Sequence, residues 1–234
     1  MTVALCLEGV RGGHAGFVLE VEALSLKRGE AVALHGPSGA GKSTLLDMLA
    51  LARAPEVATT FRLTPREGAA LDLRGLWAAG QDRAITDARA RHYGYVLQQG
   101  GLLPFLDVRA NIEMPLALLG RSAAGRVKAL AARLDITALL DRMPATLSVG
   151  QRQRVAIARA LVHTPDIVLA DEPTASVHPG MADTVMTLLR EEAAAAGAAL
   201  LLATHDPERA ARLGFRLLRL CPDADGAARS VLPA

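Results

Sequence analysis

The 234-residue chain is 51% apolar, which excludes an intrinsically disordered protein and is enough for a sizeable core. Its formal net charge of +2, without runs of like charge, gives no reason to expect a nucleic-acid partner. No apolar run approaches the roughly 18 residues of a membrane span, and Met1 is not followed by a signal-peptide pattern, so we expect a cytoplasmic protein. Cys6 and Cys221 have no metal-ligand spacing and are expected to be reduced thiols.

The first fifty residues contain strand and helix patterns around one glycine-rich stretch. Apolar stretches at 3–7 and 17–21 predict two strands, joined by a glycine-containing turn at 11–14. The apolar run 31–34 predicts a buried parallel strand, and the leucine-rich stretch 44–50 predicts a helix.

Residues 53–91 differ in character, since they mix threonines, Pro65 and Gly68 with alternating Leu71 and Leu73. This composition predicts a small peripheral β element and a loop. The elements predicted after them are, in chain order, a strand at 93–97, a helical block at 107–142, a helix at 150–163, a strand at 167–170, a helix at 181–196, a strand at 200–203 and an apolar run at 215–220.

The alternation of strands and helices predicts an α/β fold whose mainly parallel core sheet is flanked by helices. We expect one domain over residues 1–221, with a helical subdomain inserted at about 105–160, because the α/β pattern resumes only after it. Residues 222–234 form a polar, glycine-containing tail that is expected to be flexible.

The stretch 36–44 fits the phosphate-binding pattern G-x-x-x-x-G-K-[ST] and lies between a predicted strand and a predicted helix. Its glycines let successive N–H groups point at a phosphate, and the helix adds the positive end of its dipole. Lys42 is expected to reach the β- and γ-phosphates, and the Ser43 hydroxyl to bind Mg²⁺. The predicted nucleotide-binding residues are Gly36, Pro37, Ser38, Gly39, Ala40, Gly41, Lys42, Ser43 and Thr44.

Potential site residues follow three further predicted strands, at Gln98, at Asp171 with Glu172, and at His205. Ligands bind at the carboxyl ends of strands in open parallel sheets, so we expect these residues to converge on the phosphate loop. Asp171 has the position of a carboxylate that holds Mg²⁺ through water, and Glu172 can accept a proton from an attacking water. Gln98 and His205 would be unremarkable alone.

Residues 147–154 (LSVGQRQR) resemble the signature of ABC transporters, and the resemblance to their nucleotide-binding subunits extends from Val3 to Leu220. It implies a P-loop NTPase of the ABC type that uses ATP and Mg²⁺. By this resemblance, Gln98 senses Mg²⁺ and the transmembrane partner, Glu172 is the catalytic base and His205 touches the γ-phosphate. Two subunits would pack head to tail, and each would present its signature to the ATP of the other; the contacting residues would be Ser148, Gly150 and Gln151.

The chain departs from the family pattern at three positions. Val149 replaces a signature glycine, and His178 stands where the family usually has an aspartate that helps couple the two sites. The second change is compatible with slow or pH-dependent hydrolysis, and equally with a neutral histidine that substitutes as a hydrogen-bonding group. Gly13 occupies the usual position of the aromatic residue that stacks on adenine; of the nearby His14 and Phe17, we select His14.

The resemblance predicts an ATP-hydrolysing motor subunit that drives a separate membrane permease from the cytoplasmic face of the membrane. Within the family, the short chain and the stretch 95–105 are most similar to the lipoprotein-releasing and macrolide-exporter group. Two alternatives stay open: a regulatory or weakly hydrolysing subunit, and a soluble ABC ATPase without a transport role. The partner subunit can be identical or different, and the transported substrate depends on contacts that belong to another chain.

Overall fold

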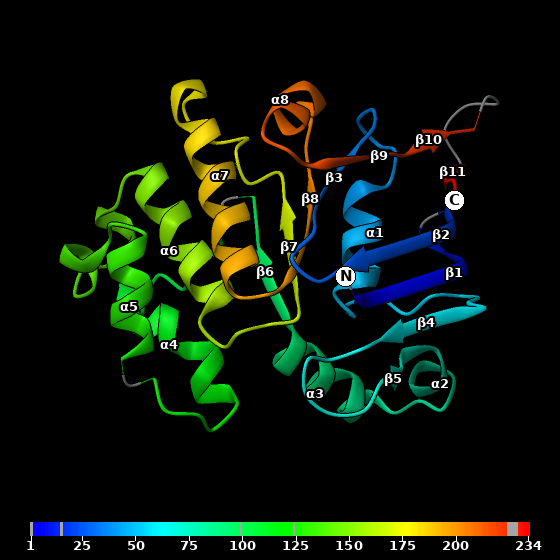
Figure 1. Cartoon of the computed structure of the whole chain (residues 1–234), viewed down its shortest axis with the longest axis horizontal. Helices are drawn as coiled ribbons and strands as arrows, with labels where there is room; N and C mark the ends of the chain where they lie inside the picture. Colours follow the sequence, from blue (N-terminus) through cyan, green and yellow to red (C-terminus); the bar gives the residue numbers. More distant parts are fainter. Residues whose placement is uncertain (1, 15, 99, 124, 224–228) are drawn as a thin grey trace.

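The computed structural model describes residues 2–14, 16–98, 100–123, 125–223 and 229–234. Two sheets and the helices around them make up this part of the chain (Figure 1). The parallel sheet has the strand order β6-β7-β8-β3-β9. Its strands are β3 (Ala31–His35), β6 (Tyr93–Val96), β7 (Ile167–Asp171), β8 (Ala199–Ala203) and β9 (Arg216–Arg219).

The second sheet is mainly antiparallel and has the order β10-β11-β2-β1-β4-β5. Its strands are β1 (Val3–His14), β2 (Phe17–Lys27), β4 (Thr60–Leu63), β5 (Leu71–Asp72), β10 (Cys221–Pro222) and β11 (Arg229–Leu232). The turn predicted at 11–14 is wrong, because pairing with β2 continues as far as His14, opposite Phe17. The glycines there mark close approaches of neighbouring chain rather than a turn: a Cβ on Gly12 would lie 2.8 Å from the sulfur of Met48.

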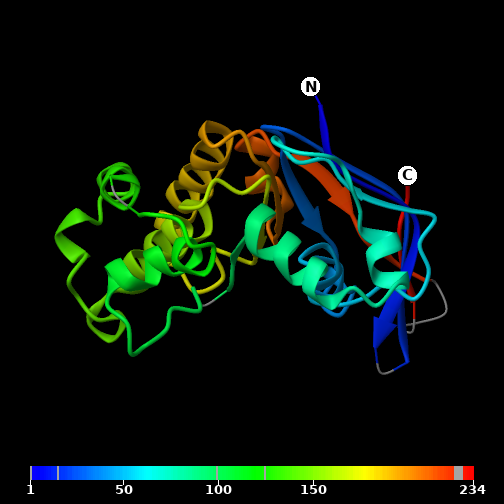
Figure 2. The same cartoon turned by 90° about the horizontal axis from the view of Figure 1, so that it is seen from below.

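The inner strands β7 and β8 are apolar apart from Asp171 at the end of β7, because both faces of the sheet are covered there. In β7, Val168 and Ala170 face one hydrophobic cluster, whereas Ile167 and Leu169 face the other. Figure 2 shows the main helical group on the side of the molecule away from the antiparallel strands. On that side lie α4 (Val108–Leu118), α5 (Arg126–Arg133), α6 (Val149–Leu161) and α7 (Pro179–Ala195); α1 (Lys42–Leu49) packs between the two sheets.

Two helices replace the loop expected within residues 53–91, namely α2 (Leu73–Ala78) and α3 (Asp82–His92). The alternation of Leu71 and Leu73 was misleading because the strand ends at Asp72, whose side chain accepts a hydrogen bond from the Gly75 N–H and caps α2. A third helix without a sequence-based prediction, α8 (Pro207–Arg212), follows β8 and is capped in the same way by Asp206. Short 3₁₀ turns occupy Thr137–Leu139 and Pro144–Thr146.

The expected flexible tail is corrected in part, since residues 229–232 form β11 and pair in parallel with β2. Leu232 is buried, and Arg229 lies 2.6 Å from Glu20. Residues 224–228 of the predicted tail lie outside the described part of the chain. The domain limits at 1–221 and the subdomain at about 105–160 remain predictions.

A buried carboxylate holds the amino edge of the parallel sheet together. Asp166, just before β7, lies 2.8 Å from Nη1 of Arg28 and 2.8 Å from Nδ1 of His92, and accepts the Arg66 N–H at 2.7 Å. Burial alone would raise the pKa of this carboxyl, but the bonds from His92, Arg28 and Arg66 lower it to about 2. One ionised side chain therefore connects the β2–β3 turn, the chain after β4 and the end of α3.

We predict that Asp166→Asn lowers the free energy of unfolding by about 2–4 kcal/mol, because it leaves a buried cationic cluster without its carboxylate. The native pKa lies below the usual 3.8, so the stabilisation is complete above that value and is lost as the pH falls towards about 2. Urea unfolding at neutral pH measures the loss. Asp135→Asn, which affects a 94% exposed carboxylate paired with Arg154, is the control and should change little; equal effects of both variants would contradict the assignment.

Candidate active site

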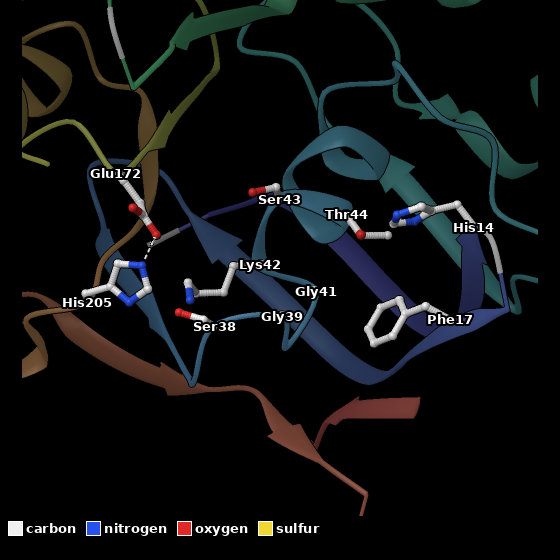
Figure 3. Close-up of a pocket in the computed structure, with 10 residues that line it drawn as sticks. All are labelled: His14, Phe17, Ser38, Gly39, Gly41, Lys42, Ser43, Thr44, Glu172 and His205. Atoms are coloured by element: carbon white, nitrogen blue, oxygen red, sulfur yellow. Dashed lines mark ion pairs between the residues drawn. The ribbon is translucent and has the colours of Figure 1, made fainter. Parts of the chain in front are cut away.

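Polar residues from three parallel strands meet at the carboxyl edge of the sheet. The phosphate loop follows β3, Asp171 ends β7, and His205 is the second residue after β8. A cavity of about 440 Å³ lies between the phosphate loop, His205 and Glu172, the residue after Asp171 (Figure 3). The residues that line it are His14, Phe17, Ser38, Gly39, Gly41, Lys42, Ser43, Thr44, Glu172 and His205.

The phosphate loop has the backbone that an anion site needs. Gly39 and Gly41 adopt left-handed conformations with φ values of 78° and 88°, and no side chain caps α1, so the first N–H groups of the helix remain available. The ammonium of Lys42 donates to the carbonyls of Gly36 at 3.0 Å and Pro37 at 3.2 Å. The predicted residues Gly36, Pro37 and Ala40 shape the loop rather than line the cavity.

Ser43 and Asp171 lie together across the strand ends, with Ser43 Oγ 3.0 Å from Asp171 Oδ2. Mg²⁺ typically keeps several waters and takes only one or two protein oxygens beside the oxygens of a bound phosphate. A hydroxyl and a carboxylate beside the phosphate loop fit that requirement. No cluster of three potential metal-ligating side chains occurs among the described residues, so a site built entirely from such side chains is not found there.

Glu172 and His205 form an ion pair at the side of the cavity that faces Lys42 (Figure 3). Glu172 has a φ of 44°, which is uncommon for a residue with a side chain, and its N–H donates to the Ala203 carbonyl of β8. The loop after β7 is thereby tied to β8. The Glu172 side chain is only 18% exposed, whereas that of His205 is 51% exposed.

The other predicted residues lie outside this cavity. Gln98 is exposed after β6 and does not contribute to the described lining. Ser148 caps α6, its hydroxyl accepting the Gln151 N–H while the Gln151 side chain accepts the Ser148 N–H. Gly150 is buried against Met181. A single chain therefore does not bring the signature to its own phosphate loop.

Two of the residues that depart from the family pattern, His178 and Val149, also lie outside the cavity. His178 is exposed and caps α7, with its Nδ1 3.3 Å from the Gly180 N–H that it accepts. This contact favours an imidazole with a free lone pair on Nδ1. Val149 is 39% exposed at the first turn of α6.

Two aromatic rings lie at the opposite end of the cavity from Glu172 (Figure 3). The rings of His14 and Phe17 are 6.2 Å apart at 61°, an edge-to-face arrangement, and Phe17 packs so closely on Gly41 that a Cβ there would meet its ring at 2.7 Å. Gly13 has no space for a side chain, since its Cβ would lie 1.8 Å from the Phe17 carbonyl oxygen. From the sequence we selected His14 and not Phe17, whereas strand pairing places both residues at the cavity.

Four features define a P-loop nucleoside triphosphatase: a glycine-rich loop between a strand and a helix, a basic side chain on this loop, a serine–aspartate pair, and a glutamate directly after the aspartate. Comparison with known proteins identifies the family of P-loop nucleoside triphosphatases to which the chain belongs. Residues 19–175 match the ABC transporter family, and the chain therefore belongs to it. It is the ATP-binding, ATP-hydrolysing subunit of such a transporter, and the resemblance, fold and activity predicted from the sequence are confirmed.

Two relatives and one solved structure illustrate the similarity. The lipoprotein-releasing system ATP-binding protein LolD of Maricaulis maris (strain MCS10) is 40% identical over 220 residues, covering 93% of this chain and 90% of that protein. The macrolide export ATP-binding/permease protein MacB of Rhodopseudomonas palustris (strain BisB18) is 38% identical over 90% of this chain, which matches 31% of that protein. A dimeric post-hydrolysis state of the ATP-binding cassette MJ0796, bound to ADP and Pi, aligns over 92% of this chain and 93% of that chain, with a TM-score of 0.74 and 30% identity.

We predict that Gly13→Ala lowers the free energy of unfolding by about 2–4 kcal/mol, because the added methyl group collides with backbone that cannot move independently. Urea unfolding measures the effect. Gly180→Ala is the matched control, since its Cβ would meet only the His178 ring, at ordinary distances of 3.5 Å to Nδ1 and 3.9 Å to Cε1. If Gly13→Ala were as stable as the wild type, the hairpin of β1 and β2 would accept a side chain at residue 13. The aromatic residue that the family usually has there would then not be excluded by lack of space.

Proposed function

We propose that Glu172 is the general base of ATP hydrolysis and that Ser43 and Asp171 hold Mg²⁺. The observation that carries this proposal is the arrangement around one cavity, in which the Glu172–His205 pair faces Lys42 and the Ser43–Asp171 pair lies beside it. Glu172 is mostly buried and tied to β8, so its carboxylate has a defined direction. The Gly36–Thr44 loop supplies the N–H groups for the phosphates.

In this mechanism a water attacks the γ-phosphorus while Glu172 accepts its proton. A bond forms between the water oxygen and phosphorus as the bond to the oxygen bridging the β- and γ-phosphates breaks, which yields ADP and inorganic phosphate. Lys42 neutralises charge on the phosphates, and His205 positions Glu172 and contacts the γ-phosphoryl group. When bound, Mg²⁺ neutralises phosphate charge and orients the oxygens.

A second subunit would complete the site. Ser148, Gly150 and Gln151 begin a 13-residue helix whose first turn lies outside the chain's own cavity. A helix N-terminus of this length can bind a phosphate. The dimeric cassettes among the similar structures support a head-to-tail pair, in which this turn contacts the γ-phosphate held by the other subunit. The same pairing leaves Gln98 free to contact Mg²⁺ and the membrane partner.

The base of the nucleotide would lie against His14 and Phe17. The two rings line the same cavity as the phosphate loop, and Phe17 is held in place by Gly41. Stacking on an aromatic face contributes about 1–3 kcal/mol per base and discriminates weakly between purines. We therefore assign Phe17 and His14 jointly to the position predicted for His14 alone.

A permease would dock on the loop before α4. The buried side chain of Asn111 accepts the Leu103 N–H and donates to the carbonyls of Leu103, Leu106 and Asp107, at 2.8–3.0 Å. This clamp holds the loop in one conformation, in which Phe105 is 73% exposed. A large apolar side chain on a rigid loop is typical of an interaction anchor. Leu97, 42% exposed after β6, adds apolar surface beside Gln98.

The relatives are an ATP-binding protein of a lipoprotein-releasing system and two export ATP-binding/permease proteins, which supports a permease of that group as the partner. The chain would then lie peripherally on the cytoplasmic face of the membrane; no described helix is long and apolar enough to cross the bilayer. A regulatory, weakly hydrolysing subunit is the second candidate, because His178 replaces the coupling aspartate and is used as a helix cap.

We predict that Glu172→Gln lowers the turnover of ATP by a factor on the order of 10²–10⁴, because the amide cannot accept the proton of water. Nucleotide affinity should stay within about threefold of wild type, since the loop contacts are unchanged. Phosphate production and fluorescent-nucleotide titration measure the two quantities. Glu208→Gln, which affects an exposed glutamate in the first turn of α8, is the control, and wild-type turnover in Glu172→Gln would remove Glu172 from this role.

We predict that Phe105→Ala reduces binding of the chain to membranes that contain its permease by roughly 10- to 150-fold, since a buried aromatic anchor contributes about 1.5–3 kcal/mol. Co-sedimentation with such membranes measures the bound fraction, and the ATPase activity of the isolated chain should not change. Leu118→Ala is the matched control because Leu118, at the end of α4, is also 73% exposed. If both variants lose binding equally, the contact is not specific to Phe105.

A further inference from the structure

A second cavity lies behind the phosphate loop, on the other side of His205 from the nucleotide cavity. It has a volume of about 260 Å³, several times the roughly 30 Å³ of one water molecule. We call it the rear cavity. Its lining comes from the carboxyl ends of three neighbouring strands, β3, β8 and β9, and consists of His35, Gly36, Pro37, Thr204, His205, Pro207 and Arg219.

The titratable side chains in the described lining of the rear cavity are all basic. Its titratable residues are His35, His205 and Arg219, and none of the described lining residues is a carboxylate. His35 and Arg219 are register partners on the parallel strands β3 and β9, so their side chains lie next to each other on one face of the sheet. Among the described residues, Arg219 forms no ion pair, in contrast to Arg216 on the same strand, which binds Glu30. The rear cavity therefore has a solvent-exposed guanidinium that no carboxylate neutralises among the described residues.

The surroundings of His35 lower its pKa. Burial, Arg219 and Lys42 together hold the pKa of His35 below its ordinary value. Lys42 contributes from the far side of the loop, where its ammonium binds the carbonyls of Gly36 and Pro37. The same two residues line the rear cavity, so the loop itself is the wall between the cavities. An anion in the rear cavity would be attracted by Arg219 directly and by Lys42 through this wall.

His205 is the one described residue that lines both cavities. The His205 side chain is half exposed and pairs with Glu172. Figure 3 shows this pair beside Lys42 and Ser38. Rotation of a half-exposed imidazole about its side-chain bonds requires no movement of the sheet. A phosphate released at the γ-phosphate position would thus lie next to the rotatable side chain of His205, which also lines the rear cavity.

We propose that the rear cavity is a second oxyanion site, in which Arg219 and His35 hold the inorganic phosphate that hydrolysis releases past His205. No bond is made or broken in this transfer, because the phosphate leaves as the free ion. The proposal rests on the hydrolytic roles assigned to Glu172 and Lys42. It gives the chain a phosphate exit separate from the route by which ADP leaves.

Inorganic phosphate is the probe, and Glu172→Gln saturated with Mg²⁺ and ATP is the background, because ATP then fills the phosphate loop. Line broadening in ³¹P spectra should show binding of added inorganic phosphate to this complex. Arg219→Gln in the same background should weaken that binding at least fivefold, the order expected when a charge-assisted hydrogen bond is lost. Arg219→Lys keeps the charge and should retain most of the binding.

Arg212→Gln is the matched control, since Arg212 is 66% exposed and its 3.7 Å contact with Asp183 lies away from the rear cavity. Absence of phosphate binding once ATP is bound, or equal binding in Arg219→Gln, would overturn the proposal. In the hydrolysing chain, Arg219→Gln should also slow phosphate release while leaving ADP release unchanged. Normal turnover in Glu172→Gln would instead refute the assigned base, so the two failures are distinguishable.

Discussion

The register between β3, β8 and β7 determines where the chemistry of this chain can occur. Leu34 pairs with Ala203, and Ala203 in turn pairs with Asp171, so the three strands end at one level. Apolar residues fill the strands because the sheet is covered on both faces. Polar side chains therefore occur only at the last residue of these strands or just beyond it, as at His35, Asp171 and Thr204. The hydrogen bonds from Thr204 to Leu34 and from Glu172 to Ala203 extend the alignment just beyond the strand ends.

This alignment brings the phosphate loop, the Ser43–Asp171 pair and Glu172 close to one another, without any contribution from the α6 helix. The first turn of α6 is capped by Ser148 and does not line the nucleotide cavity. In the proposed mechanism, one chain therefore supplies only part of the contacts to the γ-phosphate, and the first turn of α6 supplies the others to the ATP of a second subunit. ATP binding can then be converted into association of subunits, and the energy of association into movement of an attached permease. The rigid Phe105 loop lies between the strand end at β6 and the helices that would transmit this movement.

The parts of the fold that could be predicted from sequence are those whose cause is local. The Gly36–Thr44 loop, the apolar run before Asp171 and the leucines of α1 each determine their own structure, and their positions were predicted within a few residues. The errors share another cause. Residues 229–232 form a strand only because β2 offers an open edge, and α2 begins where Asp72 caps it. Phe17 could have been found from strand pairing, because residues flanking a tight hairpin lie side by side. The lack of space at Gly13 depends on the Phe17 carbonyl and could not be read from the residue alone.

The central claim is that Ser148 of one subunit completes the ATP site of another. It is tested most directly by the mass of Glu172→Gln in solution, measured by light scattering with and without Mg²⁺ and ATP. Adding Ser148→Asp keeps a good N-cap for α6 but places a carboxylate against the phosphate, whereas Ser148→Thr keeps both the cap and the neutral hydroxyl. The account predicts that ATP doubles the 24.5 kDa mass in Glu172→Gln alone and with Ser148→Thr, but not with Ser148→Asp. A mass that ATP never changes, or that doubles equally with Ser148→Asp, would contradict it.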